Sequence, residues 1–146
     1  MWLYPPDARK YEDLAEYMSR KLPYAYLEKS IAYALEKMGQ FDRKRLRNAL
    51  KWGQQPTVKV RDLKGDRYGE FTPRIGSNEI RISRKRVEEF EAGKGLRQAR
   101  NGKVYVIGVT LLHELVHWCD DQDGIEQHPS EEGLEFEKMV YGSTIW

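Results

Sequence analysis

The chain has 146 residues, of which 40% are hydrophobic and 33% are charged, and its net charge is +2. This length suits one hydrophobic core and is too short for two, and the balance of apolar and charged residues excludes disordered and fibrous proteins. Cys119 is the only cysteine, which excludes an internal disulfide, so we expect one disulfide-free domain over residues 1–146.

Periodic apolar residues predict helices in the first third of the chain. The pattern predicts a helix over residues 7–21, which Asp7 can cap, followed by an interruption at Pro23. A second helix is expected over about residues 25–38, and a third over residues 42–52. Their apolar faces predict a common core.

Strand-like alternation then replaces the helical period. Residues 57–63 and 79–83 alternate apolar and polar side chains, which is typical of strands, and residues 69–72 can form a third, short strand. Residues 84–91 have a helical pattern again. The order of helices, small sheet and helices predicts an α+β fold with an antiparallel or mixed sheet of about three strands.

Two more helices are expected at the C-terminal end. The more apolar one runs from Val104 to about Asp120, and Ser130 can cap a last helix over residues 131–141. The longest apolar run, Val104 to Leu112, is far too short to cross a bilayer. The N-terminus lacks the order of a secretory signal, so we expect neither membrane insertion nor a classical signal peptide.

The predicted apolar helix contains the motif H-E-x-x-H. Residues four apart lie on one face of a helix, so His113 and His117 can present two imidazole nitrogens to one zinc ion. Glu114 is rotated by about 100° from His113, which removes it from the ligand face but lets it take a proton from a water at the metal. The motif therefore predicts a zinc-dependent hydrolase with Glu114 as its base.

A catalytic zinc site needs a third protein ligand, and three acids are candidates. Asp123 has the third-ligand spacing of metzincins, but the turn glycine and the later histidine of that group are absent. Glu132 and Glu137 can both point inward from the last helix. Gly133 beside them would let that helix approach the zinc helix closely.

Charge is distributed unevenly along the chain. Residues 1–103 hold 24 Lys/Arg and 14 Asp/Glu, a balance of +10, whereas residues 104–146 have a balance of −8. A bound cation accounts for the acidic end. The basic residues are dispersed among acids and not clustered on one element, so we expect no nucleic-acid partner.

Several runs of residues together resemble a known family. Residues 113–124 read His-Glu-Leu-Val-His-Trp-Cys-Asp-Asp-Gln-Asp-Gly, and Glu131-Glu-Gly-Leu-Glu-Phe-Glu and Tyr141-Gly142 follow. Together with residues 49–53 and 77–81, these runs resemble the zinc metallopeptidase domains of bacterial polymorphic toxins. They are similar to the peptidase domain at the C-terminus of some type VI secretion spike (VgrG) proteins.

The resemblance implies a zincin-like fold, with Glu132 as the third ligand and Glu114 as the base. It also implies a protein or peptide substrate, secretion as an antibacterial effector, action in a competitor's periplasm, and a cognate immunity protein. One departure is Cys119, where a small residue such as Gly is expected, and which we interpret as a core residue. By analogy with zincins, the strand around residues 78–83 is expected to be the sheet edge that pairs with a peptide.

Two residues are candidates for donating a proton to the oxyanion. His128 precedes a proline in a loop, and Tyr141 is a rival for this role, although packing at the end of the helix is its expected function. Two alternatives to a peptidase stay open. One is a zinc amidase that acts on peptidoglycan stem peptides, and the other is a binding module with a structural zinc, which an intact Glu114 disfavours.

Overall fold

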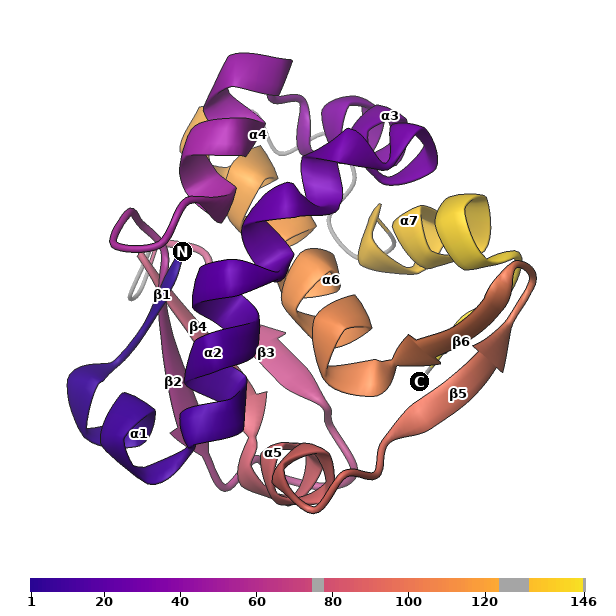
Figure 1. Cartoon of the computed structure of the whole chain (residues 1–146). Helices are drawn as coiled ribbons and strands as arrows, with labels where there is room; N and C mark the ends of the chain where they lie inside the picture. Colours follow the sequence, from indigo (N-terminus) through magenta and orange to yellow (C-terminus); the bar gives the residue numbers. More distant parts are fainter. Residues whose placement is uncertain (75–77, 124–131, 146) are drawn as a thin grey trace.

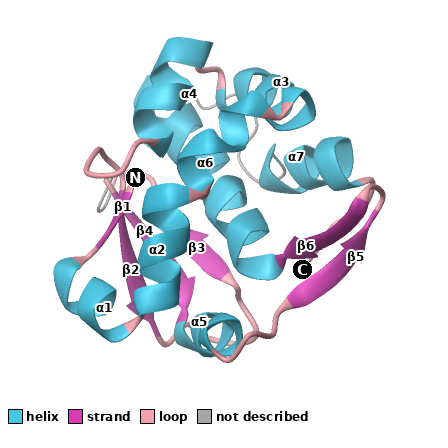
Figure 2. Ribbon diagram, in the orientation of Figure 1, coloured by secondary structure: helices cyan, strands magenta, loops and turns pink. Residues whose placement is uncertain are grey.

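Helices pack against a small mixed sheet in the computed structural model, which describes residues 1–74, 78–123 and 132–145 (Figures 1 and 2). The predicted α+β fold class is confirmed. The elements, in chain order, are β1 (Trp2–Leu3), α1 (Pro5–Lys10), α2 (Glu12–Arg20), the 3₁₀ helix η1 (Leu22–Leu27), α3 (Lys29–Gly39), α4 (Arg43–Leu50), β2 (Thr57–Arg61), β3 (Gly69–Phe71), β4 (Glu79–Ser83), α5 (Arg84–Glu91), β5 (Leu96–Ala99), β6 (Gly102–Tyr105), α6 (Val106–Asp123) and α7 (Glu132–Tyr141).

The main sheet has the strand order β1-β2-β4-β3, in which β1, β2 and β4 are parallel and β3 is antiparallel to β4. Strand β4 therefore lies inside the sheet, and its Ile80 and Ile82 are fully buried. The expectation that the strand around residues 78–83 forms the edge is wrong, because β3 covers that side of β4. The sequence missed β1, since two residues are too few to show a period.

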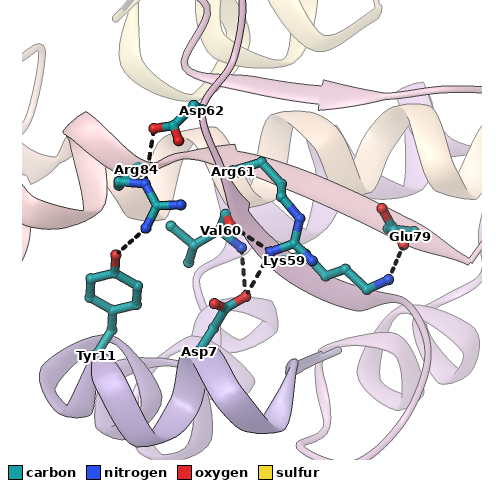
Figure 3. A network of polar contacts seen from close by, with 8 residues as sticks. All are labelled: Asp7, Tyr11, Lys59, Val60, Arg61, Asp62, Glu79 and Arg84. Carbon is teal, nitrogen blue, oxygen red and sulfur yellow. Dashed lines mark hydrogen bonds and ion pairs between the residues drawn. The ribbon is translucent and has the colours of Figure 1, made fainter.

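The first predicted helix is divided in two at Tyr11, whose φ of −118° and ψ of 77° lie outside the helical region. The Tyr11 hydroxyl accepts a hydrogen bond from Arg84 at 3.1 Å. Asp7 lies within α1 and does not cap it. Its carboxylate instead accepts from the backbone N–H of Val60 at 2.9 Å and pairs with Arg61 at 3.4 Å, which ties α1 to β2 (Figure 3).

The second predicted helix begins later than expected. Pro23 lies in the first turn of η1, and the α-helix proper, α3, starts at Lys29. Helix α4 begins as predicted after Asp42, whose carboxylate accepts from the backbone N–H of Arg45 at 2.8 Å. The hairpin of β5 and β6 was not predicted, and it includes Val104, which the sequence pattern had placed in the following helix.

Helix α6 runs through the middle of the molecule and contacts α3, α7, β3 and β4 (Figure 1). Every residue from Val106 to Val116 is buried, because apolar side chains dominate this stretch around the whole helix. His113 and Glu114 are thereby placed in the core, and His117 is partly exposed. Among the described residues, no helix combines the length and apolarity that a membrane span requires.

Candidate active site

The side chains of His113 and His117 lie one turn apart on α6. Their ring centroids are 5.1 Å apart and the ring planes are inclined by 61°. Two imidazoles bound to one tetrahedral ion at about 2.0–2.1 Å would have their ring centres about 5 Å apart. The observed spacing of the two rings therefore suits one shared ion.

Helix α7 contributes two buried carboxylates that meet these histidines. Glu132 is 5% exposed, and its Oε2 lies 3.5 Å from Nδ1 of His117. Glu137 is fully buried, with its Oε1 2.6 Å from Nδ1 of His113. A neutral His113 that donates its Nδ1–H to Glu137 carries its lone pair on Nε2. A hydrogen bond donated in this direction would fix both the orientation and the tautomer of His113.

Gly133 allows α7 to lie directly against His113. A Cβ atom at this position would be 2.2 Å from Nε2 and 2.4 Å from Cδ2 of the His113 ring. No side chain larger than hydrogen fits without displacing the ring or the helix. The expectation that Gly133 permits a close approach of the two helices is confirmed.

The three proposed ligands are neighbours, but they do not form a complete site. Among the residues that the structure describes, no three His, Cys, Asp or Glu side chains form a group that could hold a metal ion. The structure pairs Glu132 with His117 and Glu137 with His113. The side chain of Asp123 lies outside what the structure describes, as do the whole of His128 and the predicted cap at Ser130. The donor types present, imidazole and carboxylate, fit a divalent metal such as zinc.

Glu114 lies against the edge strand β3 and is 3% exposed. A Cβ atom on Gly69 would lie 2.6 Å from Oε1 of Glu114. Burial raises the pKa of Glu114 to about 8 and the Glu70 carboxylate adds to this, whereas a backbone hydrogen bond from Phe71 and the charge of Arg81 act in the opposite direction. In the metal-free site the carboxyl therefore favours its protonated form at neutral pH.

The metal-free protein is expected to become less stable, through Glu114, as the pH rises from 4.5 to 8. The pKa of this group is 4.5 in its ordinary environment and about 8 in the fold, so the folded state binds the extra proton in this window. Glu114→Gln removes that titration. Melting temperatures of both proteins, measured with a chelator at several pH values, should diverge in favour of the variant as the pH rises.

His117 changes the pH dependence of stability in the opposite direction in both proteins, because burial and then the charge of His113 lower its pKa from 6.5 to about 4. Its contribution to stability is lost as the pH falls from 6.5 to 4, and it cancels in the comparison of wild type with variant. A difference in melting temperature that does not change with pH would contradict the burial-driven shift of Glu114.

Tyr141 and Cys119 have the packing roles that the sequence predicts. The ring of Tyr141 packs edge-on against Phe136, its backbone carbonyl accepts from Arg100, and burial raises the pKa of its hydroxyl. Cys119 is fully buried against Gly39, and burial raises the pKa of its thiol, which keeps it protonated. A part for Tyr141 in oxyanion stabilisation stays a prediction.

Sequence reasoning missed three residues around this site. Gly69 contacts Glu114, Glu70 raises the pKa of Glu114, and the backbone N–H of Ile145 donates to Oε2 of Glu137 at 2.5 Å. A glycine in a short predicted strand often marks a close approach by another group, so Gly69 had a usable signal. Glu70 and Ile145 have none, because their partners are distant in the sequence.

Comparison with known proteins supplies the family. A family model described as metallopeptidase toxin 3 matches residues 7–142. Comparison with curated proteins and with solved structures gives no significant match. The resemblance to toxin metallopeptidases is confirmed, whereas the likeness to secretion spike proteins stays a prediction. Because the match covers nearly the whole sequence, the chain belongs to the metallopeptidase toxin 3 family.

Proposed function

We propose that this metallopeptidase toxin is a zinc-dependent endopeptidase in which His113, His117 and Glu132 hold the metal and Glu114 is the base. Family membership supports peptidase activity in a toxin. The main support for metal binding by these residues is the contact of α6 with α7, where two imidazoles lie beside two carboxylates. His113, Glu132 and Glu137 are buried and His117 is partly exposed. Burial of such groups is costly unless they are paired or bind a cation.

Zinc suits this donor set. It accepts imidazole nitrogen and carboxylate oxygen at about 2 Å, and three protein ligands leave one position open for substrate. When bound, zinc polarises the scissile carbonyl and lowers the pKa of the attacking water.

The chain's own residues supply the other parts of the mechanism. Glu114 removes a proton from the attacking water and later returns it to the leaving amine. Glu137 holds the Nδ1 side of His113 and keeps the imidazole in one orientation. His128 and Tyr141 are the two candidate donors to the oxyanion. An extended peptide would add to the sheet at the open edge of β3.

The toxin family also motivates the biological proposal. We propose an antibacterial effector that acts in the periplasm of a target bacterium and is neutralised in the producing cell by a cognate immunity protein. Residues 1–146 are proposed to act as one catalytic domain, which is supported by one hydrophobic core and by the extent of the family match.

A chelator is expected to stop peptide cleavage without unfolding the protein. The core is built from apolar side chains of helices and sheet, so metal binding does not have to provide the energy of folding. Circular dichroism and cleavage of a peptide library should be measured before chelation, after it and after zinc is returned. Cleavage that survives complete metal removal would contradict metal dependence, and loss of all helical signal would show a structural metal.

A further inference from the structure

Glu114 lies so close to Gly69 on the edge strand β3 that a side chain at this position would collide with it. We propose that Gly69 is a positioning residue, which holds the Glu114 carboxylate in place by leaving its own side-chain position empty. This inference rests on the role of Glu114 as the base. It assigns part of the active-site geometry to a strand whose residues precede the H-E-x-x-H motif by more than forty positions.

Steric contacts at Gly69 point to Glu114 itself. A Cβ atom there would lie 2.6 Å from Oε1 and 2.7 Å from Cγ of Glu114, and 2.8 Å from Cγ2 of Thr110. Carbon contacts in proteins are favourable at about 3.5–4.0 Å, so none of these distances can be kept. Glu114 is 3% exposed, so its side chain is closely surrounded by protein.

Strand β3 is less free to move than the carboxylate is. Glu70 pairs with Arg81 on β4 at 3.5 Å and with Arg67 at 2.9 Å. The backbone N–H of Ser83 also donates to the carbonyl of Tyr68 at 2.8 Å, just before the strand. The contacts with Arg81 and Ser83 link β3 to β4 on both sides of Gly69. A Cβ atom at Gly69 is therefore expected to displace the Glu114 side chain rather than the strand.

The strand register adds a second link to Glu114. In an antiparallel pair of strands, hydrogen-bonded and non-hydrogen-bonded residue pairs alternate. Tyr68 and Ser83 form a hydrogen-bonded pair. Glu70 therefore also directs its backbone groups toward β4, whereas Gly69 and Phe71 direct theirs toward the open edge. A backbone hydrogen bond from Phe71 acts on the Glu114 carboxylate. Gly69 and Phe71 therefore both affect the Glu114 side chain. Gly69 leaves space for it, and Phe71 provides a hydrogen bond from its backbone N–H.

The main test is Gly69→Ala in the zinc-loaded enzyme. We expect kcat to fall by about 10- to 100-fold, because small misplacements of reacting groups have effects of this size. KM and zinc affinity should stay within about twofold of wild type. Such a split separates positioning of the base from loss of substrate or metal binding. A kcat equal to that of wild type would overturn the proposal.

Thr110→Ser separates the carboxylate contact from ordinary helix–strand packing. It deletes the methyl group that the new Cβ would meet, and it keeps the hydroxyl that donates to the Val106 carbonyl at 2.9 Å. In Gly69→Ala/Thr110→Ser we expect the melting temperature to recover and kcat to stay low. Recovery of kcat would show that packing against Thr110 explains the loss, and would overturn the proposal. This double variant also serves if Gly69→Ala alone fails to fold.

Gly39→Ala is the matched control, because Gly39 at the end of α3 packs against the same central helix, α6. Its new Cβ would lie 2.8 Å from Cβ of Cys119, which packs α3 against α6 away from Glu114. We expect this variant to lower the melting temperature and to leave kcat within about twofold of wild type. An equal fall of kcat in both glycine variants would show that any strain on α6 impairs catalysis, which overturns a specific role for Gly69.

A double-mutant cycle with Glu114→Gln distinguishes failure of this inference from failure of the proposed function. If Gly69 acts through Glu114, Gly69→Ala should reduce the residual activity of Glu114→Gln no further. In the metal-free proteins, the Phe71 amide resonance should shift in both single variants. Full activity of Glu114→Gln would contradict the proposed function itself. Additive losses and an unmoved Phe71 resonance would contradict only the role of Gly69.

Discussion

Replacing Glu114 by Gln is expected to abolish peptide cleavage while the protein keeps its zinc and its fold. Gln has nearly the same shape, so the close approach to Gly69 is retained. It cannot accept the proton of the attacking water, and removal of a general base costs about 10²- to 10⁴-fold or more in rate. The measurement is kcat on a peptide library, with zinc content determined on the same samples.

The same variant tests the biological role. Wild type directed to the periplasm of a test bacterium should arrest growth, and Glu114→Gln should not. Because the amide removes a buried titratable carboxyl, the melting temperature of the metal-free variant should equal or exceed that of the metal-free wild type above pH 7. Near-normal cleavage by a folded, zinc-loaded Glu114→Gln protein would exclude Glu114 as the base.

Local patterns predicted the parts of the site that lie on helices. The apolar period placed His113 and His117 on one face of a helix, and the structure has them one turn apart within α6. The same reasoning predicted that Glu132 and Glu137 point inward, and both are buried, whereas Glu135 on the same helix is exposed. Such predictions succeed because helical geometry fixes which residues share a face over a few turns.

Contacts between distant segments could not be predicted in the same way. Asp7 has the residue type of a helix cap, yet its carboxylate serves the backbone of Val60 more than fifty residues away. The pairing of β3 with β4 made β3 the edge strand, and alternation within each strand carries no information about the order of strands. Ile145 reaches Glu137 through a backbone N–H group, which no residue type signals.

Glu132→Ala is expected to lose most of its zinc, because Glu132 is the proposed third ligand. Its carboxylate is buried at the start of α7 and lies 3.5 Å from Nδ1 of His117. Gly133, the next residue, brings the same turn of α7 against the ring of His113. A third ligand has to lie beside the two histidines, and Glu132 is a buried carboxylate next to one of them. Zinc stoichiometry and affinity should be measured by titration of the metal-free protein.

Glu137 provides the internal comparison, because it is equally buried but already bonds to His113 and to the N–H of Ile145. Glu137→Ala should lose about 10- to 100-fold in zinc affinity or activity, as is typical when the partner of a metal-binding histidine is removed, and should still bind one zinc at high concentration. Asp123→Ala is expected to bind zinc as the wild type does. If Glu132→Ala kept full occupancy at wild-type affinity while Asp123→Ala or Glu137→Ala lost the metal, the third ligand would be the acid whose removal empties the site.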